Sequence, residues 1–448
     1  MDSAKHGKAL REKVSRKSQG DFKLHDKERS VIDLIELSNY DRIQELVPIR
    51  HKRMSASPFS FYRATAGIMA RDLAHLPRTE INVQAIGDCH LMNFGGFATP
   101  ERILVFDAND FDETLPASWE WDLKRLATSF VLSARENSMI ESDAKDVVSA
   151  LVQTYRQQVY QYSQMNLLDL WYTKFDFETL RKNASSGEVR RLLEKAIARS
   201  GKTNQESIFY KITSNLLGKY EINEQPPLIY HPIDVKKEHE MILTFLDHYA
   251  QTLQDDRRWL FEQYEIVDIA LKVVGVGSVG TRCYVVLMMN KKKEPLFIQV
   301  KEARASVLEP FTAISRYSHN GQRVVEGQRL VQAASDIFLG WSTGPAGRHF
   351  YFRQLRDRKV SPAMSDKDKV LLNAYARLCG RVLARAHAKT GDATMIAGYM
   401  GKGEVLDNAI VKFAVAYADQ TENDYTTFMK GIKSGRLPIS EQSVQEGS

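Results

Sequence analysis

Apolar residues recur with two different periods along the chain, and the change of period divides it into regions. Intervals of three and four residues mark helices at residues 30–37, at 57–73 and over most of 121–250. Short β-rich runs at residues 81–86 and 103–106 predict two strands inside this region, and the glycines and proline of 94–101 predict a hairpin turn between them. The first half of the chain is therefore predicted to be mainly helical.

The pattern changes near residue 264, where apolar and β-branched residues form runs typical of strands. Residues 266–274, 283–289 and 296–301 predict an antiparallel meander, followed by a helix at 321–330 and a strand at 349–355. Residues 365–389 then have the apolar stripe of an amphipathic helix, and helical segments continue to about residue 433. We expect an α+β protein of two lobes, a small antiparallel sheet lobe and a larger helical lobe.

These elements predict four segments in the chain. Residues 1–30 are rich in charge and have no apolar core, so they predict a mobile N-terminal arm rather than a signal peptide. The other three segments are 31–255, a first helical part of the large lobe; 256–360, the sheet lobe; and 361–448, its second helical part.

Composition narrows the class of protein. The net charge of +6 over 448 residues is small and both signs are interspersed, so it gives no strong signal for nucleic acid and suits an anionic ligand equally well. Three cysteines, Cys89, Cys283 and Cys379, have no metal-ligand spacing, which fits a reducing cytoplasm. No run approaches the roughly 18 apolar residues of a membrane span.

Carboxylates and amides gather in one stretch of the first half. Gly87-Asp88-Cys89-His90-Leu91-Met92-Asn93 follows one predicted strand, Asn109 to Glu113 follows the next, and Trp121-Asp122-Leu123 comes shortly after. Phosphoryl transfer needs one carboxylate for the proton of the nucleophile and further oxygen ligands for a metal ion. Asp and Asn also favour turns without any chemistry. Two like charges close together are costly, however, unless they share a cation or a proton.

A glycine-rich loop interrupts the predicted sheet. Residues 275–280 match G-x-G-x-x-G, a pattern shared by two unrelated phosphate-binding designs. The residues that follow are strong β-formers, so the loop is expected to close a hairpin, as in protein kinases. Lys301 at the end of the third strand would then pair with nucleotide phosphates, and Glu326 on the next helix would hold the lysine, with Glu309 as a rival partner. The predicted nucleotide-binding residues are Gly275, Gly277, Ser278, Gly280, Lys301 and Glu326.

Two resemblances follow from these motifs. Gly87-Asp88-x-His90-x-x-Asn93, Asp110-Phe111-Asp112 and Trp121-Asp122-Leu123 resemble the catalytic and metal segments of aminoglycoside and choline phosphotransferases of the protein-kinase-like superfamily. Nearly the whole chain also resembles the bacterial family catalogued as domain of unknown function 2252. In kinases the glycine loop precedes the catalytic loop, whereas here it follows about 180 residues later. The resemblance thus implies a circularly permuted, two-lobed protein-kinase-like fold.

The phosphotransferase resemblance also implies roles for individual residues. Asp88 would be the catalytic base, Asn93 and Asp110 would bind magnesium, and Asp122 would brace the catalytic loop. Asp107 and Asp112 are further metal candidates, because a single sequence does not fix the register of this segment. His90 is expected to bond the loop backbone, as a second structural brace. Residues 384–388 resemble the helix end that precedes the catalytic loop in those enzymes.

The predicted function is an ATP-dependent, magnesium-assisted phosphotransferase acting on an unidentified small-molecule or protein hydroxyl. Three alternatives remain open: a nucleotide-binding pseudokinase with a regulatory or scaffold role, a nucleotidyltransferase on the same fold, and a metal-dependent phosphoesterase. A phosphoesterase needs several more His and Asp ligands than these motifs supply. The expected partners are a nucleotide and an unidentified acceptor, and the expected location is the cytoplasm.

Overall fold

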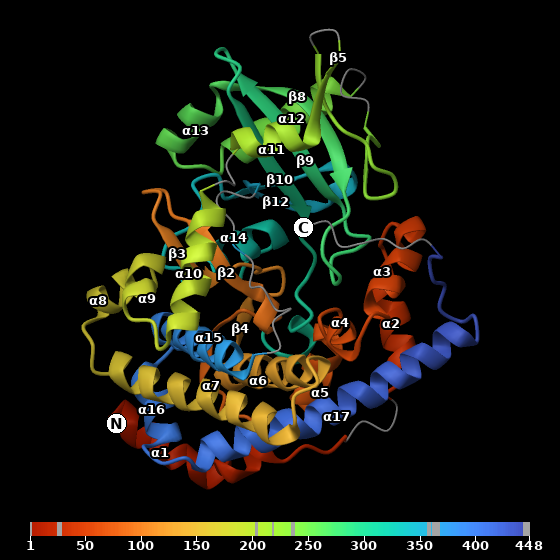
Figure 1. Cartoon of the computed structure of the whole chain (residues 1–448). Coiled ribbons are helices and arrows are strands. Elements are labelled where there is room, and N and C mark those ends of the chain that lie inside the picture. The colour runs from red at the N-terminus through yellow and green to blue at the C-terminus, as the bar shows by residue number, and fades with distance from the viewer. Residues whose placement is uncertain are drawn as a thin grey trace.

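The computed structural model describes residues 2–24, 29–201, 205–216, 219–233, 238–355, 360 and 368–441. A six-stranded sheet lies at one end of the molecule, and long helices form the other end (Figure 1). The mixed α+β class predicted from the sequence is confirmed. No helix among these residues combines the length and the apolar character needed to cross a membrane.

The large sheet is antiparallel throughout, with strand order β11-β12-β10-β9-β8-β7. The predicted meander corresponds to its centre, where each strand pairs with the next along the chain. Its strands are β7 (Ile229–Tyr230), β8 (Tyr264–Lys272), β9 (Cys283–Asn290), β10 (Pro295–Glu302), β11 (Gly340–Thr343) and β12 (His349–Gln354).

Apolar side chains cover both faces of this sheet. One face packs against α12 (His239–Ala250) and α13 (Asp255–Phe261), where Tyr249 stacks on Phe352 with ring centroids 3.9 Å apart. The other face packs against α11 (Gln205–Ile212) and the ribbon of β5 (Thr213–Leu216) and β6 (Lys219–Ile222). The predicted start of the sheet lobe at residue 256 is therefore too late. The described parts of 205–250 belong with the sheet, because α11, β6 and α12 bury apolar side chains on it.

Helices from both halves of the chain form the other end. α6 (Trp119–Glu136) is buried between α7 (Glu141–Tyr162) and α17 (Val405–Lys433), and α15 (Lys369–Thr390) packs along α7. Trp119 stacks on Tyr155 with an interplanar angle of 3°. The described part of the helix predicted at 365–389 begins at Lys369, and residues 365–367 lie outside the described residues. The remaining helices are α2 (Val31–Asn39), α3 (Val47–Met54), α4 (Pro58–Tyr62), α5 (Ala66–Ala74), α8 (Leu167–Tyr172), α9 (Phe177–Lys182), α10 (Gly187–Ser200) and α14 (Asn320–Val331).

The N-terminal segment is not a mobile arm in its described residues. Residues Ser3–Lys13 form α1, which lies against α16 (Ala393–Met400). A Cβ at Gly7 would sit 2.0 Å from the carbonyl oxygen of Met395, and one at Gly398 would sit 2.3 Å from that of Ala4. Two glycines thus let the helix backbones approach closely. The charged composition of the segment gives no sign of this packing, because close contact between helix backbones does not require apolar side chains.

Two short ribbons carry the acidic stretch between the sheet and the helices. β1 (Asn82–Ala85) pairs with β4 (Leu115–Ser118), and β2 (Phe94–Ala98) pairs with β3 (Leu104–Ala108). The two predicted strands, 81–86 and 103–106, do form, but they are not partners. The glycines of the predicted turn form β2 itself, and the chain turns at residues 99–102, closed by the N–H of Arg102 donating to Thr99.

Candidate active site

The loop that follows β1 is hydrogen-bonded to a side chain of α6. The carboxylate of Asp122 accepts hydrogen bonds from the N–H groups of Ile86 at 2.7 Å and Gly87 at 3.0 Å. Gly87 has φ of +85°, a conformation that suits glycine. On its other side Asp122 lies 3.3 Å from Nε2 of His387, at the end of α15. One buried carboxylate thus connects the loop to two helices, which is the contact that the expected brace would make.

Asp88 is bound by an arginine that the sequence motifs did not single out. Nε and Nη2 of Arg125 lie 2.7 Å and 2.6 Å from Oδ1 of Asp88. Burial raises the pKa of the Asp88 carboxyl, and Arg125 opposes that shift. The Asp88 side chain keeps 23% of its surface exposed. Its second oxygen, Oδ2, has no hydrogen-bond donor among the described residues, and Nε2 of His90 lies 3.8 Å from it.

Asn93 and His90 lie on the same loop. Nδ2 of Asn93 donates to the carbonyl of Asp88 at 2.7 Å, so the amide oxygen of Asn93 is left for another partner. Within the described part of the loop, the His90 side chain makes no hydrogen bond to the backbone of a neighbouring residue, so its expected bracing role stays a prediction. Its ring is buried edge-on to Phe59, and Nδ1 has no hydrogen-bond partner among the described residues. Burial lowers the pKa of His90 well below its usual value, so the ring is neutral.

Lys301 meets the second acidic segment. Its ammonium on β10 donates to Oδ2 of Asp112 at 2.7 Å and lies 3.9 Å from Oδ1 of Asp110. The hydroxyl of Tyr351 on β12 donates to the other oxygen of Asp112 at 2.6 Å. The loop between β3 and β4 is thereby attached to the sheet. Residues that are 189 positions apart in the sequence come together at this contact.

The two neighbouring carboxylates differ in electrostatic environment. Burial and the nearby Asp112 raise the pKa of Asp110. Burial acts on Asp112 as well, but Lys301 and the Tyr351 hydroxyl outweigh it and lower the pKa of that carboxyl. Asp112 is thus a charge paired by a hydrogen bond, whereas Asp110 keeps 35% of its side chain exposed and has Lys301 only at the longer distance of 3.9 Å. A carboxylate in this state favours a cation that the protein itself does not provide.

Asp107 is excluded as a metal candidate by its surroundings. Its side chain is 1% exposed, and Nη2 of Arg385 donates to Oδ1 at 2.7 Å. The N–H of Ala333 donates to Oδ2 at 3.0 Å. Both oxygens are therefore used inside the protein. The pattern of residues 107–112 could not show this, because the partners come from α15 and from the end of α14.

Glu326 does not hold Lys301, so this prediction is wrong. Its carboxylate pairs with Arg329 on the same helix at 2.9 Å. The rival Glu309 accepts from the N–H of Ser315 at 2.9 Å instead. The face of α14 that meets the site carries Arg323, which donates to the carbonyls of Asp112 and Thr114 at 2.8 Å and 2.7 Å. Asp112 takes the place at Lys301 that was expected for a helix glutamate.

The glycine loop closes the β8–β9 hairpin, as predicted. It is not an open lid, because its carbonyl groups are bound by the segment before α4. Arg53 donates to Gly275, Nη1 of Arg42 donates to Val279 at 2.6 Å, and the N–H of Ile43 donates to Gly280 at 2.8 Å. A Cβ at Gly277 would lie 3.2 Å from the carbonyl oxygen of Arg63. The loop is therefore fixed against the helical end of the molecule.

Most carbonyl groups of the glycine loop are hydrogen-bonded, whereas most of its amide groups have no acceptor among the described residues. Within the described part of the chain, the N–H groups of residues 275–278 and of Gly280 have no hydrogen-bond acceptor. Gly275 and Gly280 both have positive φ, at +65° and +86°. Successive amides in a turn form a concavity that binds anions where their N–H groups converge on one side. Ser278 contributes its backbone here, and its carbonyl accepts from Thr281.

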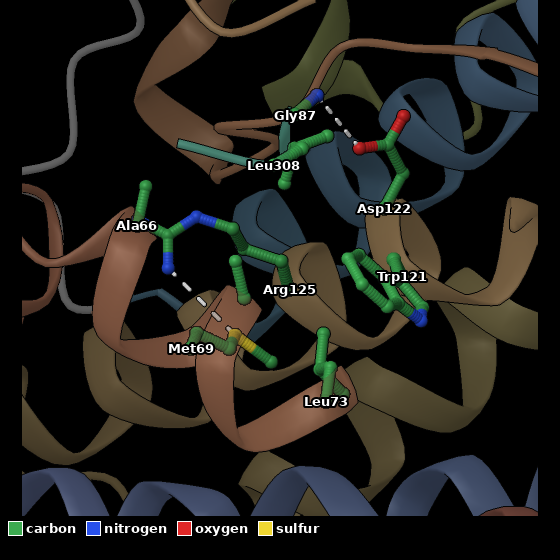
Figure 2. A pocket seen from close by; sticks show the side chains of 9 residues that line it. Ala66, Met69, Leu73, Gly87, Trp121, Asp122, Arg125 and Leu308 are labelled. Carbon is green, nitrogen blue, oxygen red and sulfur yellow. Dashed lines mark hydrogen bonds between the residues drawn. The ribbon is translucent and has the colours of Figure 1, made fainter. Parts of the chain in front are cut away.

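A small cavity lies where α5 and α6 meet Gly87, rather than between these groups (Figure 2). It has a volume of about 10 Å³ and is lined by residues of α5 and α6, including Met69, Leu73, Trp121 and Arg125. That volume holds about one water molecule. The cavity is therefore too small for a nucleotide. One of the residues that line it, Arg125, binds Asp88.

The residues fit a magnesium ion only in part. Asn93 and Asp110 offer amide and carboxylate oxygens, the ligand types that Mg²⁺ prefers, and Mg²⁺ commonly binds through one or two carboxylates plus substrate phosphates. In the described residues no group of three or more His, Cys, Asp or Glu side chains forms a metal site by itself. A magnesium ion held by Asn93 and Asp110 would complete its coordination with water and with the phosphates of a nucleotide.

Sequence reasoning missed Arg125, the pairing of Asp112 with Lys301, and the arginines that fix the glycine loop. Arg125 follows Asp122 by three residues on α6, so the helical period places both on one face. That signal could have been found. Arg42 and Arg53 gave none, because they bind backbone carbonyls, which any sequence offers.

Comparison with known proteins identifies a family but no activity. Residues 42–431 match the family described as "Uncharacterized protein conserved in bacteria (DUF2252)", which confirms the second resemblance seen in the sequence. No curated protein and no solved structure matches the chain. The likeness of its catalytic segments to the phosphotransferases stays a prediction.

Proposed function

The chain belongs to the DUF2252 family, and we propose that it is an ATP-dependent, magnesium-assisted phosphotransferase that acts on a hydroxyl group. The proposed fold is protein-kinase-like in circularly permuted order. The sheet would form the nucleotide lobe, and the helices from both chain ends would form the lobe that carries the catalytic loop. The acceptor hydroxyl belongs to a small molecule or to a protein.

One observation carries this proposal: Lys301 from the sheet meets Asp110 and Asp112 from the loop beyond β3. A lysine at the end of the third strand, opposite an acidic pair, is the arrangement that kinases use to hold nucleotide phosphates and their metal ion. The free amides of the glycine loop support it, because they offer a phosphate site on the same sheet, one strand away from Lys301.

The three aspartates have separate roles in this proposal. Asp110, with Asn93, would hold magnesium, which when bound neutralises charge on the phosphate oxygens. Asp112 would keep Lys301 directed at the nucleotide, and Asp107 is structural. Asp88 would accept the proton of the acceptor hydroxyl through Oδ2, the oxygen that Arg125 leaves unbound.

A nucleotide-binding pseudokinase is the second candidate, and a specific observation favours it. Both charged groups expected to do chemistry are already paired inside the protein, Asp88 with Arg125 and Lys301 with Asp112. Such a protein would bind the nucleotide and turn nothing over.

The deciding experiment combines calorimetry of Mg·ATP binding with ATP consumption against a panel of hydroxyl-bearing metabolites and peptides. For an enzyme, Asp88→Asn should reduce turnover by about 10²–10⁴-fold, the range for loss of a general base, and leave nucleotide affinity nearly unchanged. Binding without turnover for every acceptor would favour the pseudokinase. The mass of any modified acceptor separates phosphoryl from nucleotidyl transfer. Absence of Mg·ATP binding would refute both readings.

A further inference from the structure

Asp88 is the one candidate catalytic group whose orientation depends on a single side chain from another element. Both contacts from Arg125 go to the same oxygen, Oδ1, at 2.7 Å and 2.6 Å. Oδ2 accepts no hydrogen bond within the described residues, and the Asp88 side chain keeps 23% of its surface exposed. A carboxylate bound through one oxygen cannot rotate freely, so the direction of its second oxygen is set by the arginine.

Arg125 is itself held in place from several sides. Nη2 donates to the carbonyl of Tyr62 at 3.0 Å, and Nη1 lies 3.7 Å from the sulfur of Met69 (Figure 2). The guanidinium also lies over the Tyr62 ring, 4.3 Å from its centroid. The Tyr62 hydroxyl in turn donates to the carbonyl of Arg125 at 2.9 Å. The arginine side chain is 3% exposed, so its position is fixed by packing as well as by charge.

We propose that Arg125 is a positioning residue for the reaction: it binds Oδ1 of Asp88 and thereby directs Oδ2 at the acceptor hydroxyl. This inference rests on the proposed function for its role in turnover, whereas the contact itself does not. The planar guanidinium donates from Nε to Oδ1 of Asp88 and from Nη2 to the Tyr62 carbonyl, a fixed arrangement that a lysine ammonium cannot reproduce. The arginine touches neither the nucleotide nor the acceptor.

The test compares Arg125→Gln and Arg125→Lys with Arg135→Gln. Arg135 lies near the C-terminal end of the same helix, where it forms surface ion pairs with Glu141 and Asp419 and not with Asp88. Arg125→Gln should lower kcat about 10- to 100-fold, with the KM for Mg·ATP unchanged, because only the orientation of the base is lost. Arg125→Lys should retain part of kcat, and Arg135→Gln all of it. Guanidinium at millimolar concentration should restore part of kcat to Arg125→Ala and none to Asp88→Asn.

A second readout does not depend on turnover. Carbodiimide labelling, followed by mass spectrometry at one fixed pH, reports how accessible the Asp88 carboxylate is. Labelling of Asp88 should rise several-fold in Arg125→Gln, less in Arg125→Lys, and not in Arg135→Gln. Where Arg125→Gln does not yield folded protein, Arg125→Lys provides the same comparison.

The outcomes separate the two proposals. Unchanged labelling in both Arg125 variants would overturn the inference, as would a rise in labelling with full kcat. Equal losses in kcat and nucleotide affinity would also overturn it, because they indicate a general structural role. If the wild-type protein turns nothing over, the proposed function fails as an enzyme and Arg125 has no reaction to serve, whatever the labelling shows.

Discussion

Two carboxylates five residues apart show how differently the same segment can use a charge. Asp107 is 1% exposed and satisfied by Arg385 and by backbone amides, whereas Asp112 is 28% exposed and faces Lys301 across the junction with the sheet. The strand β3 ends between them, at Ala108. A carboxylate on the strand is enclosed by the helices, and one on the loop beyond it faces the other part of the molecule. Whether Asp107 or Asp112 can contact a ligand thus depends on its position relative to the end of β3.

The largest effect should follow from removing the enclosed charge. Asp107→Ala would leave the guanidinium of Arg385, which is 0% exposed, without its counter-ion. Breaking one partner of a buried ion pair costs about 3–5 kcal/mol, so the free energy of unfolding in urea should fall by about that amount.

Asp176→Ala is a suitable control, since that residue caps α9 on the surface and should cost only about 1 kcal/mol. A loss for Asp107→Ala no larger than this control would contradict the structural role of Asp107.

The Lys301–Asp112 pair should affect nucleotide binding rather than the stability of the fold. Replacing Lys301 by Ala should weaken Mg·ATP binding by about 1–3 kcal/mol, the value of a charge-assisted hydrogen bond. Isothermal calorimetry measures this directly. Lys292→Ala, an exposed lysine in the β9–β10 turn, is the matched control and should bind normally. Equal affinity in the two variants would show that Lys301 does not contact the nucleotide.

Glu113, which follows Asp112 on the same loop, should make the stability of the protein depend on pH. Burial raises its pKa to about 7, against 4.5 for an ordinary glutamate, while Arg323 and the N–H of Val307 oppose the shift. The folded protein therefore binds a proton that the unfolded chain releases. Its contribution to stability is complete below about pH 4.5 and is lost as the pH rises through about 7.

The free energy of unfolding should accordingly fall by at most about 1.4 kcal/mol per pH unit in that interval through this group. Glu113→Gln imitates the protonated form, so urea unfolding at about pH 5 and about pH 8 should show a smaller decline than in the wild type. Glu262→Gln on the surface should leave the decline as it is. The same slope in Glu113→Gln as in the wild type would show that another group causes it.

The smallest expected effect on stability concerns Asp110. Asp110→Ala removes the 3.9 Å contact with Lys301 but also the repulsion from Asp112, and because the two effects offset, the free energy of unfolding should change by less than about 0.5 kcal/mol. The same variant should lose most of the magnesium dependence of ATP binding. A large destabilisation would instead place Asp110 with Asp107 as a structural carboxylate.

The sequence by itself determined much of the local structure. Runs of apolar and β-branched residues predicted the meander of β8, β9 and β10 and the later strand β12, because a strand covered on both faces of its sheet is apolar along its length. The glycines at 275–280, followed by β-formers, predicted a hairpin. Family membership also came from the sequence. Asp88, Asn93, Asp110 and Lys301 were singled out because their residue types and spacing are unusual together.

Only the tertiary structure decided which of these groups pair. Asp112 rather than Glu326 binds Lys301, Arg385 encloses Asp107, and Arg125 holds Asp88. The N-terminal helix docks through glycines that carry no apolar signal, and α11 and α12 pack on a sheet whose strands mostly come later in the chain. These outcomes share one physical reason. Pairing depends on distances between segments that are far apart in the sequence, and the period of a single segment contains no information about its partner.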